Sequence, residues 1–209
     1  MASDRLSVGG IVLCGGQSKR MGRPKAWLPF GPETMLQRVV RLLSSVVNPI
    51  VVVAAPEQDV PPLPAGVEVV RDEEKGRGPL QGLAAGLMAL RGRADAAYLS
   101  SCDVPFLRPA FVRRLVELLG DHAICVPRVG DYHHPLAAVY RLGVADAVAR
   151  LLAEDRLRPF FLFEAVPTRV VEAAELSDVD PTFQTLRNLN TPEEYEAALR
   201  MIDPSATGG

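Results

Sequence analysis

The 209-residue sequence contains few cysteines, no long apolar run and no excess of either charge, and each scarcity excludes a class of protein. No two of its three cysteines form a Cys-x-x-Cys pair, which argues against a zinc site or a disulfide framework. We expect Cys14, Cys102 and Cys125 to be small buried residues in a reducing compartment. The formal net charge of −2 offers no general attraction to nucleic acid, so we expect no nucleic-acid partner.

The missing apolar run bears on location. No stretch approaches the roughly 18 apolar residues that are needed to cross a bilayer, so we expect no membrane partner. The apolar segment 8–14 is short and continues directly into a glycine-rich loop, a pattern unlike that of a signal peptide. We therefore expect a cytoplasmic protein.

What is present favours an α/β domain. Hydrophobic residues make up 48% of the chain, and β-branched runs alternate with segments of helical period, as in βαβ units with a mostly parallel sheet. We predict strands over 8–13, 47–54, 67–71, 96–101, 122–127, 135–140 and 169–172. We predict helices over 35–43, 80–90, 109–119, 144–152, 159–164 and 192–201. The expected architecture is one three-layer α/β/α domain over 1–202 with a Rossmann-like central sheet, followed by a disordered tail over 203–209.

A glycine-rich, cationic loop over 13–25 follows the first predicted strand. Gly15 and Gly16 allow successive backbone N–H groups to turn inward and form an anion-binding concavity. Ser18 adds a hydroxyl, and the loop carries four cations, Lys19, Arg20, Arg23 and Lys25. The loop therefore predicts binding of phosphates.

Two better-known phosphate loops are excluded by the residue order. A P-loop needs Ser or Thr directly after its lysine, and Ala26 follows Lys25. The dinucleotide fingerprint Gly-x-Gly-x-x-Gly is absent because Gly15 and Gly16 are adjacent and the next glycine is Gly22.

Asp103 is the candidate metal ligand. It follows a predicted buried strand, and Pro105 restricts the backbone just after it. Mg²⁺ prefers one or two carboxylates together with phosphate oxygens and water, so one aspartate beside a triphosphate suffices. The alternative interpretation is that Asp103 caps the helix or turn around Pro105.

The segment Asp72–Leu83 contains three glycines and a proline before a helix of small residues. Its bare backbone around Gly78 suits contact with a base or ribose, and Asp72, at a strand end, suits the nucleotide or the metal shell. The alternative is close helix packing at Gly82 and Gly86.

Two further polar motifs lie later in the chain. His133 and His134 are candidates for a phosphate contact, a general base or plain loop residues; as neighbours they lack the i, i+4 spacing of helical metal ligands. Asn188 and Asn190 alternate with apolar residues before a helix whose capping box is Thr191 with Glu194, so both amides are expected on one side.

The pattern Leu-x-Gly-Gly-x-Ser-x-Arg-Met-Gly-x-x-Lys over 13–25 resembles the signature of nucleotidyltransferases. Taken with Asp72–Gly82, Cys102–Pro105, His134–Leu136 and Asn188–Pro192, the chain resembles the MobA-like molybdenum cofactor guanylyltransferases. The resemblance implies a fold of the nucleotide-diphospho-sugar transferase type. It also implies Mg²⁺-dependent transfer of GMP from GTP to the phosphate of molybdopterin, with release of pyrophosphate, and transient contact with other cofactor-biosynthesis proteins.

Site roles follow from the same resemblance. The residues expected at the nucleotide are Leu13, Cys14, Gly15, Gly16, Ser18, Lys25, Asp72 and Gly78. Asp103 would hold Mg²⁺, and Asn188 and Asn190 would lie at the acceptor end. The expected catalytic groups are Asp103 with its metal and two cations, Lys25 and Arg20, which neutralise charge on the triphosphate and the leaving pyrophosphate.

One departure from the family pattern leaves the substrates open. The family often places an asparagine after the second strand as a nucleotide contact, and this chain has Ala54-Ala55-Pro56. Guanine and cytosine therefore both remain candidates for the base. A sugar- or alcohol-phosphate nucleotidyltransferase and a nucleotide-binding module without catalysis also stay open as functions, and the acceptor and oligomeric state stay undecided.

Overall fold

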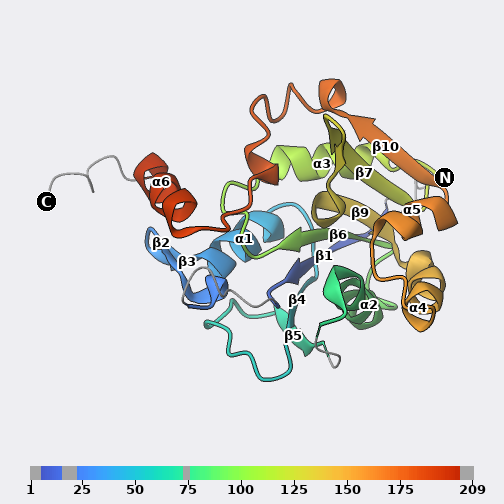
Figure 1. The fold of residues 1–209 in the computed structure, drawn as a ribbon, viewed down its shortest axis with the longest axis horizontal. Helices are drawn as coiled ribbons and strands as arrows, with labels where there is room; N and C mark the ends of the chain where they lie inside the picture. The colour runs from blue at the N-terminus through green and yellow to red at the C-terminus, as the bar shows by residue number, and fades with distance from the viewer. Residues whose placement is uncertain (1–5, 16–22, 73–75, 203–209) are drawn as a thin grey trace, which may run out of the picture.

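The computed structural model describes residues 6–15, 23–72 and 76–202. Within these residues one eight-stranded sheet has the order β10-β7-β9-β6-β1-β4-β5, with β8 paired to β7 (Figure 1). Its strands are β1 (Val8–Leu13), β4 (Ile50–Ala54), β5 (Glu68–Arg71), β6 (Ala96–Ser101), β7 (Ile124–Val129), β8 (Tyr132–His133), β9 (Ala138–Arg141) and β10 (Thr168–Glu172). A separate hairpin pairs β2 (Pro29–Phe30) with β3 (Glu33–Thr34).

Helices cover both faces of the sheet. They are α1 (Met35–Ser44), α2 (Gly78–Leu90), α3 (Pro109–Leu118), α4 (Ala145–Ala153), α5 (Phe160–Ala165) and α6 (Pro192–Ile202). One apolar core joins α1 and α3 to one face, and a second joins α2, α4 and α5 to the other. The predicted three-layer α/β/α architecture is thus confirmed. None of the described helices is long and apolar enough to span a membrane.

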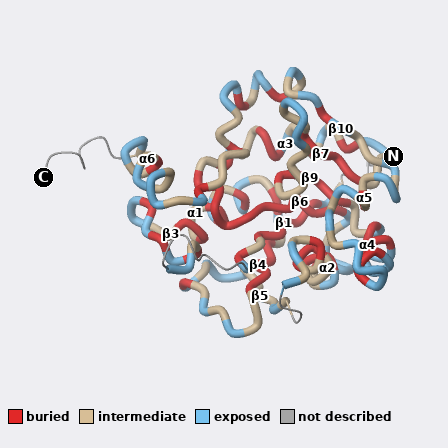
Figure 2. The backbone as a smooth tube through the Cα atoms, in the orientation of Figure 1, coloured by how far each residue is buried: buried red, intermediate tan, exposed pale blue. Residues whose placement is uncertain are grey.

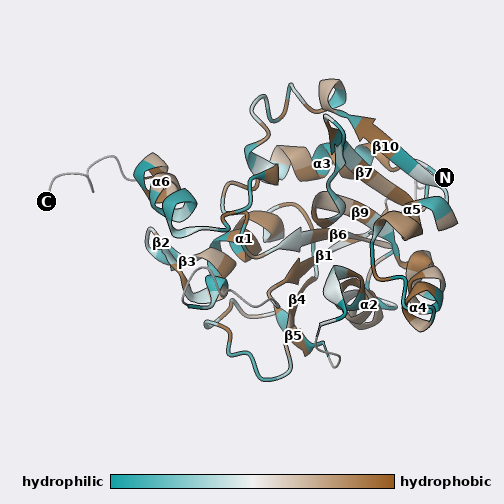
Figure 3. Ribbon diagram, viewed as in Figure 1, coloured by the Kyte–Doolittle hydropathy of each residue, from teal (hydrophilic) through white to brown (hydrophobic). Residues whose placement is uncertain are grey.

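Burial follows this layering. The buried stretches of the backbone gather in the central strands (Figure 2), of which β1 and β4 are also strongly hydrophobic (Figure 3). Successive side chains of β1 alternate between the two cores, with Val12 in one and Ile11 in the other, and both are fully buried. This two-sided burial is why the strands read as continuous apolar runs in the sequence.

The parallel pairing of the central strands brings their carboxyl ends to one edge, which is the candidate functional edge of the sheet. β1 pairs in parallel with β4 and β6, and β4 pairs in parallel with β5. The carboxyl ends of these strands therefore meet at a single edge. β9 runs antiparallel to both β6 and β7, so the sheet is mostly but not wholly parallel.

Three predicted strands begin two or three residues later than expected because local hydrogen bonds take their first residues. Val47 N donates to Leu43 O at the end of α1, so β4 begins only at Ile50. His122 N donates to Leu119 O, which places His122 in the turn before β7. The predicted strand 135–140 opens as a 3₁₀ helix over Pro135–Ala137. The tail 203–209 lies outside the described residues.

The β2–β3 hairpin, which was not predicted, anchors the C-terminal segment. Phe30 and Met35 form a small buried cluster with Leu189 and Ala198, so α6 lies beside the hairpin (Figure 1). Tyr195 Oη also donates to Pro29 O. Strands of two residues carry no periodicity, so the sequence gives no sign of them. The packing of this hairpin against the C-terminal segment brings the residues near 190 next to the residues near 25.

Gly86 shows how closely α2 lies against the sheet. A Cβ at this position would meet Ile11 Cγ2 at 2.6 Å. We expect Gly86→Val to lower the free energy of unfolding by about 2 kcal/mol, measured by urea denaturation, because overpacking a full core forces its neighbours to shift. Met88→Val, at a position 70% exposed on the same helix, is the matched control. Equal losses in the two variants would show that the close approach is unimportant.

Candidate functional site

Asp103 lies at the centre of a polar cluster just past the end of β6. Its Oδ1 accepts hydrogen bonds from Ser101 Oγ (2.6 Å) and Asn188 Nδ2 (2.7 Å). Its Oδ2 lies 2.7 Å from Lys25 Nζ, and the side chains of Lys25 and Asp103 are only 16% and 12% exposed. A carboxylate this buried needs such partners, because desolvation otherwise penalises its charge.

The alternative interpretation of Asp103 as a cap is not supported. The N-cap of α3 is Arg108, and the described donors to the Asp103 carboxylate are all side chains. Its backbone oxygen instead accepts a hydrogen bond from Leu189 N (3.0 Å) and so fixes the C-terminal segment beside it.

Lys25 connects the cluster to the glycine loop. It opens a 3₁₀ turn over Lys25–Trp27, whose Ala26 is fully buried and anchors the turn. Lys25 Nζ donates to Asn190 Oδ1 (2.8 Å) across a separation of 165 residues. One ammonium group thus bridges the carboxylate after β6 and the amide before α6.

The two asparagines reach this cluster from the same side, as predicted. Leu189 between them is fully buried against the hairpin, so its neighbours Asn188 and Asn190 face the other way. The predicted capping box is present: Glu194 N donates to Thr191 Oγ1 (3.2 Å), and Thr191 N donates to Glu194 Oε2 (3.1 Å). The start of α6 is thereby fixed, and the asparagines just before it are fixed too.

The predicted nucleotide contacts lie along the same edge. The ladder continues one residue past each strand: Cys14 N donates to Val53 O (2.8 Å), Cys102 N to Leu13 O (2.9 Å) and Asp72 N to Ala54 O (2.9 Å). Leu13, Cys14, Asp72 and Asp103 are therefore brought to one edge. Gly16, Ser18 and Arg20 lie outside the described residues.

The segment after β5 has two interpretations, a nucleotide contact around Gly78 and close helix packing at Gly82 and Gly86, and its glycines differ in which one they fit. Gly78, the first residue of α2, has a φ of +73° and open space around a Cβ, so its backbone conformation requires glycine. Gly82 is different, since a Cβ there would lie 2.9 Å from Leu13 Cδ2. Close helix packing explains Gly82 and Gly86, and the bare loop at Gly78 remains available to a ligand.

Two thiols meet at the start of the glycine loop. A hydrogen bond from Cys102 lowers the pKa of the Cys14 thiol, helped by the Arg71 guanidinium and by Gln58. The same hydrogen bond, together with burial, raises the pKa of Cys102 well above its usual range. Cys14, which leads into Gly15, is thus the more acidic of the two thiols.

The tandem histidines lie apart from this cluster in every described contact. The His133 ring packs against Phe160 and Phe163, with centroids 6.2 Å and 5.9 Å away. Burial and the neighbouring His133 lower the pKa of His134. Among the described residues no group of three His, Cys, Asp or Glu side chains could hold a metal ion.

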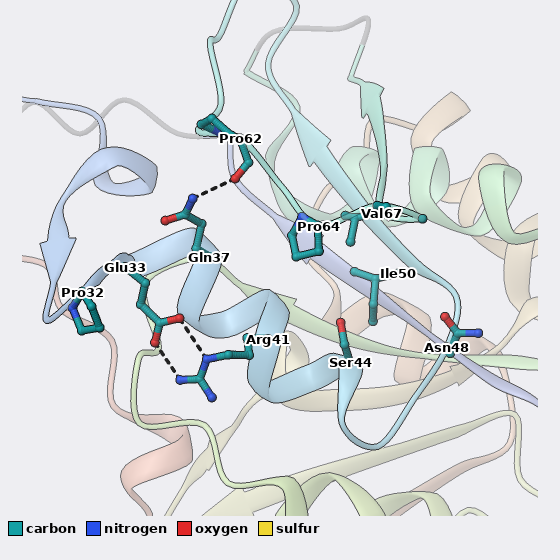
Figure 4. A pocket seen from close by; sticks show the side chains of 12 residues that line it. Pro32, Glu33, Gln37, Arg41, Ser44, Asn48, Ile50, Pro62, Pro64 and Val67 are labelled. Atoms are coloured by element: carbon teal, nitrogen blue, oxygen red, sulfur yellow. Dashed lines mark hydrogen bonds and ion pairs between the residues drawn. The ribbon is translucent and has the colours of Figure 1, made fainter.

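A cavity of about 590 Å³ lies elsewhere, between α1 and the segment 62–67 (Figure 4). Glu33 and Arg41 pair across 2.7 Å at its wall, and Gln37 Nε2 donates to Pro62 O (2.8 Å). None of its lining residues is a predicted site residue.

Three residues of this edge had no predicted role: Ser101, Gln58 and Arg71. Ser101 orients Asp103 through a hydrogen bond. In the sequence it is marked only by its position, at a strand end two residues before Asp103. Gln58 and Arg71 act on the backbone after β4, and no motif marks them.

Comparison with known proteins places this geometry in a family. A family model described as the MobA-like NTP transferase domain matches residues 10–170. The chain belongs to this family. The resemblance inferred from the sequence is confirmed at that level, as is the fold type.

Relatives in this family match over nearly the whole chain. A "probable molybdenum cofactor guanylyltransferase" of Pelotomaculum thermopropionicum is 33% identical to this chain, and the match covers 97% of each of the two chains. One of the same name from Mycobacterium ulcerans is 36% identical, over 95% of this chain and 96% of the relative. The molybdopterin-guanine dinucleotide biosynthesis protein A of Archaeoglobus fulgidus has a similar solved structure, with a TM-score of 0.77, 22% identity and coverage of 94% and 99%.

The polar cluster extends beyond the matched segment. Asp103 and Lys25 lie within residues 10–170, whereas Asn188 and Asn190 lie after it. The family domain therefore supplies the carboxylate and the ammonium group, and the C-terminal segment of this chain supplies the two amides that hold them.

Proposed function

We propose that this chain transfers GMP from GTP to the phosphate of a molybdopterin acceptor and releases pyrophosphate. Family membership supports nucleotidyl transfer, and the names of the two curated relatives support guanylyl transfer in molybdenum cofactor synthesis. The observation that carries the proposal is the convergence of Lys25 and Asn188 on Asp103, with Asn190 bonded to Lys25, at the edge where the glycine loop begins.

The reaction is an in-line displacement. An oxygen of the acceptor phosphate forms a bond to the α-phosphorus of GTP, and the bond from that phosphorus to the bridging oxygen breaks, so the electron pair leaves with pyrophosphate. Both reactants are anions, so positioning and charge neutralisation dominate catalysis and no protein nucleophile is needed. Lys25 and Arg20 are the proposed cations for the triphosphate and the leaving group.

We propose Mg²⁺ as the cofactor and Asp103 as its protein ligand. The donor set fits this ion, because carboxylate, hydroxyl and amide oxygens of Asp103, Ser101 and Asn190 lie in one cluster and Mg²⁺ takes hard oxygen ligands beside phosphate and water. When bound, it would supply charge neutralisation at the phosphates. Ser101 and Asn188 hold Oδ1 of Asp103 and thereby fix the direction of Oδ2.

The remaining roles complete the proposed site. We place the nucleotide along the ends of β1, β5 and the start of α2, in contact with Leu13, Cys14, Gly15, Gly16, Ser18, Asp72 and Gly78. We place the acceptor at Asn188 and Asn190. The support for both assignments is the shared edge of the sheet, where open α/β folds bind their ligands.

The side chains of Ala54 and Ala55 cannot distinguish guanine from cytosine, because they have no polar atoms. The backbone of Ala55 is already engaged: its N–H donates to Gln58 Oε1 (3.3 Å), and its oxygen accepts from Arg71 (3.1 Å). Recognition of guanine must therefore use other groups at this edge, and transfer from CTP is the competing activity.

A pyrophosphate-release assay tests the proposal. The full chain is incubated with Mg²⁺ and each of the four common nucleoside triphosphates, with and without molybdopterin. We expect release only with GTP and molybdopterin together. Preference for CTP would reassign the base, and release with a phosphosugar in place of molybdopterin would reassign the acceptor. Binding of GTP by calorimetry without release under any condition would contradict catalysis.

A further inference from the structure

Gln58 bridges the end of β1 and the loop after β4. Its Nε2 donates to Cys14 O (2.9 Å) and lies 3.3 Å from Cys14 Sγ, while its Oε1 accepts from Ala55 N (3.3 Å). Gln58 N also donates to Ala55 O (3.1 Å), which closes a tight turn with Pro56 at its second position. One carboxamide thus connects two strand ends at the functional edge.

Arg71 holds this turn from the end of β5. Its guanidinium donates to Ala55 O (3.1 Å) and to Gln58 O. The backbone on both sides of the Gln58 side chain is therefore fixed by a cation from the next strand. We call Gln58 and Arg71 together the clasp.

The clasp determines which way the first peptide of the glycine loop faces. In a trans peptide the C=O and the following N–H point in opposite directions. Because Cys14 O points toward β4 to meet Gln58, the N–H of Gly15 points to the other side, toward β6. Leu13 O already points that way to accept from Cys102 N, one residue before Asp103. In the part of the chain that the structure describes, Gly15 N–H has no acceptor.

We propose that Gln58 is a positioning residue for nucleotide binding, which acts by aiming the Gly15 N–H into the site between the ends of β1 and β6. Arg71 supports it by holding the turn. This inference rests on the proposed function, because it assigns the ligand of that N–H to the nucleoside triphosphate. It adds a determinant of binding to a site whose chemistry is centred on Asp103 and Lys25.

The test removes the carboxamide of Gln58 but keeps the approximate size of the side chain. We expect Gln58→Met to weaken the binding of GTP with Mg²⁺ about fivefold, the effect of losing about one oriented hydrogen bond. The Kd from calorimetry and the KM for GTP should rise together, while kcat at saturating GTP changes less than twofold. Arg71→Lys keeps the charge, but its shorter side chain withdraws the nitrogen that donates to Ala55 O and Gln58 O, and we expect the same pattern with a smaller rise.

Gln37 offers a matched control on the other side of the same loop. Its Nε2 also donates to a backbone oxygen of this loop, Pro62 O (Figure 4), and its Oε1 accepts from Thr34 N (2.8 Å). Gln37→Glu keeps the second bond and loses the first, so it loosens the loop without touching Cys14. We expect unchanged Kd, KM and kcat for GTP in this variant.

Three results would overturn the inference: a Kd for GTP within twofold of wild type in both clasp variants, a fall in kcat with KM unchanged, or an equal rise in Kd in Gln37→Glu. If Gln58→Met does not fold, the Arg71→Lys result decides. If the wild-type chain binds no GTP, the proposed function is contradicted. If the wild-type chain binds GTP and the clasp variants bind it equally well, only the inference about Gln58 is contradicted.

Discussion

Asp103→Asn is expected to slow pyrophosphate release by a hundredfold or more, on the order of the loss when a preorganised electrostatic group is removed from an active site. The substitution keeps the shape of the side chain but removes the negative charge that faces Lys25 at 2.7 Å and would bind the metal. Because Ser101 and Asn188 still find an oxygen there, the fold should be retained. The measurement is kcat for pyrophosphate release, alongside thermal unfolding.

Asp95 provides the control for this variant. It lies at the opposite end of β6, and its Oδ2 also accepts from a serine, Ser7 Oγ (2.6 Å). Asp95→Asn removes the same charge from just before the same strand, at the edge away from the site. It should leave kcat near the wild-type value. Wild-type turnover in Asp103→Asn, or an equal fall in Asp95→Asn, would remove Asp103 from the mechanism.

Lys25→Met is expected to lower kcat/KM for GTP by about a hundredfold, through weaker binding and a slower chemical step. The substitution removes the ammonium group that lies against Asp103 Oδ2 and Asn190 Oδ1, and it leaves a nearly buried carboxylate facing the negative triphosphate. Attraction is thus replaced by repulsion in a site of low exposure. Calorimetry with GTP gives the binding part, and single-turnover rates give the chemical part.

Arg23 separates this specific effect from the general charge of the loop. Arg23 is an exposed cation two residues before Lys25. Arg23→Met changes the net charge equally, and since exposed charges are screened by solvent we expect at most a severalfold change in kcat/KM. A similar loss of kcat/KM in both variants would show that Lys25 acts only as one of several solvated charges of the loop.

The sequence predicted those parts of the site that depend on local chemistry. The strand before Asp103 and the capping box of Thr191 each follow from short-range patterns of burial and hydrogen bonding. The shared side of Asn188 and Asn190 also followed, because one buried residue between two polar ones defines a face. Local rules of this kind hold whenever tertiary contacts do not compete.

The parts that were not predicted depend on contacts between distant segments. The bond from Lys25 to Asn190 exists because Leu189 packs into a cluster with Phe30 of a hairpin too short to show a pattern. The strand 47–54 was predicted too long because Val47 bonds back to α1, and a propensity for extended structure yields to such a bond. Gln58 belongs to no motif, since its role is set by the two strand ends that it happens to join.

The C-terminal position of the two asparagines has a consequence for biosynthesis. During translation the central sheet and its parallel edge are complete once β10 has emerged, but the amides that hold Asp103 and Lys25 are made only afterwards. A nascent chain can thus carry a folded sheet and a glycine loop without an ordered charge cluster. In folding during synthesis, the charge cluster can therefore be completed only after residues 188–190 have been made, later than the strands that form the edge beneath it.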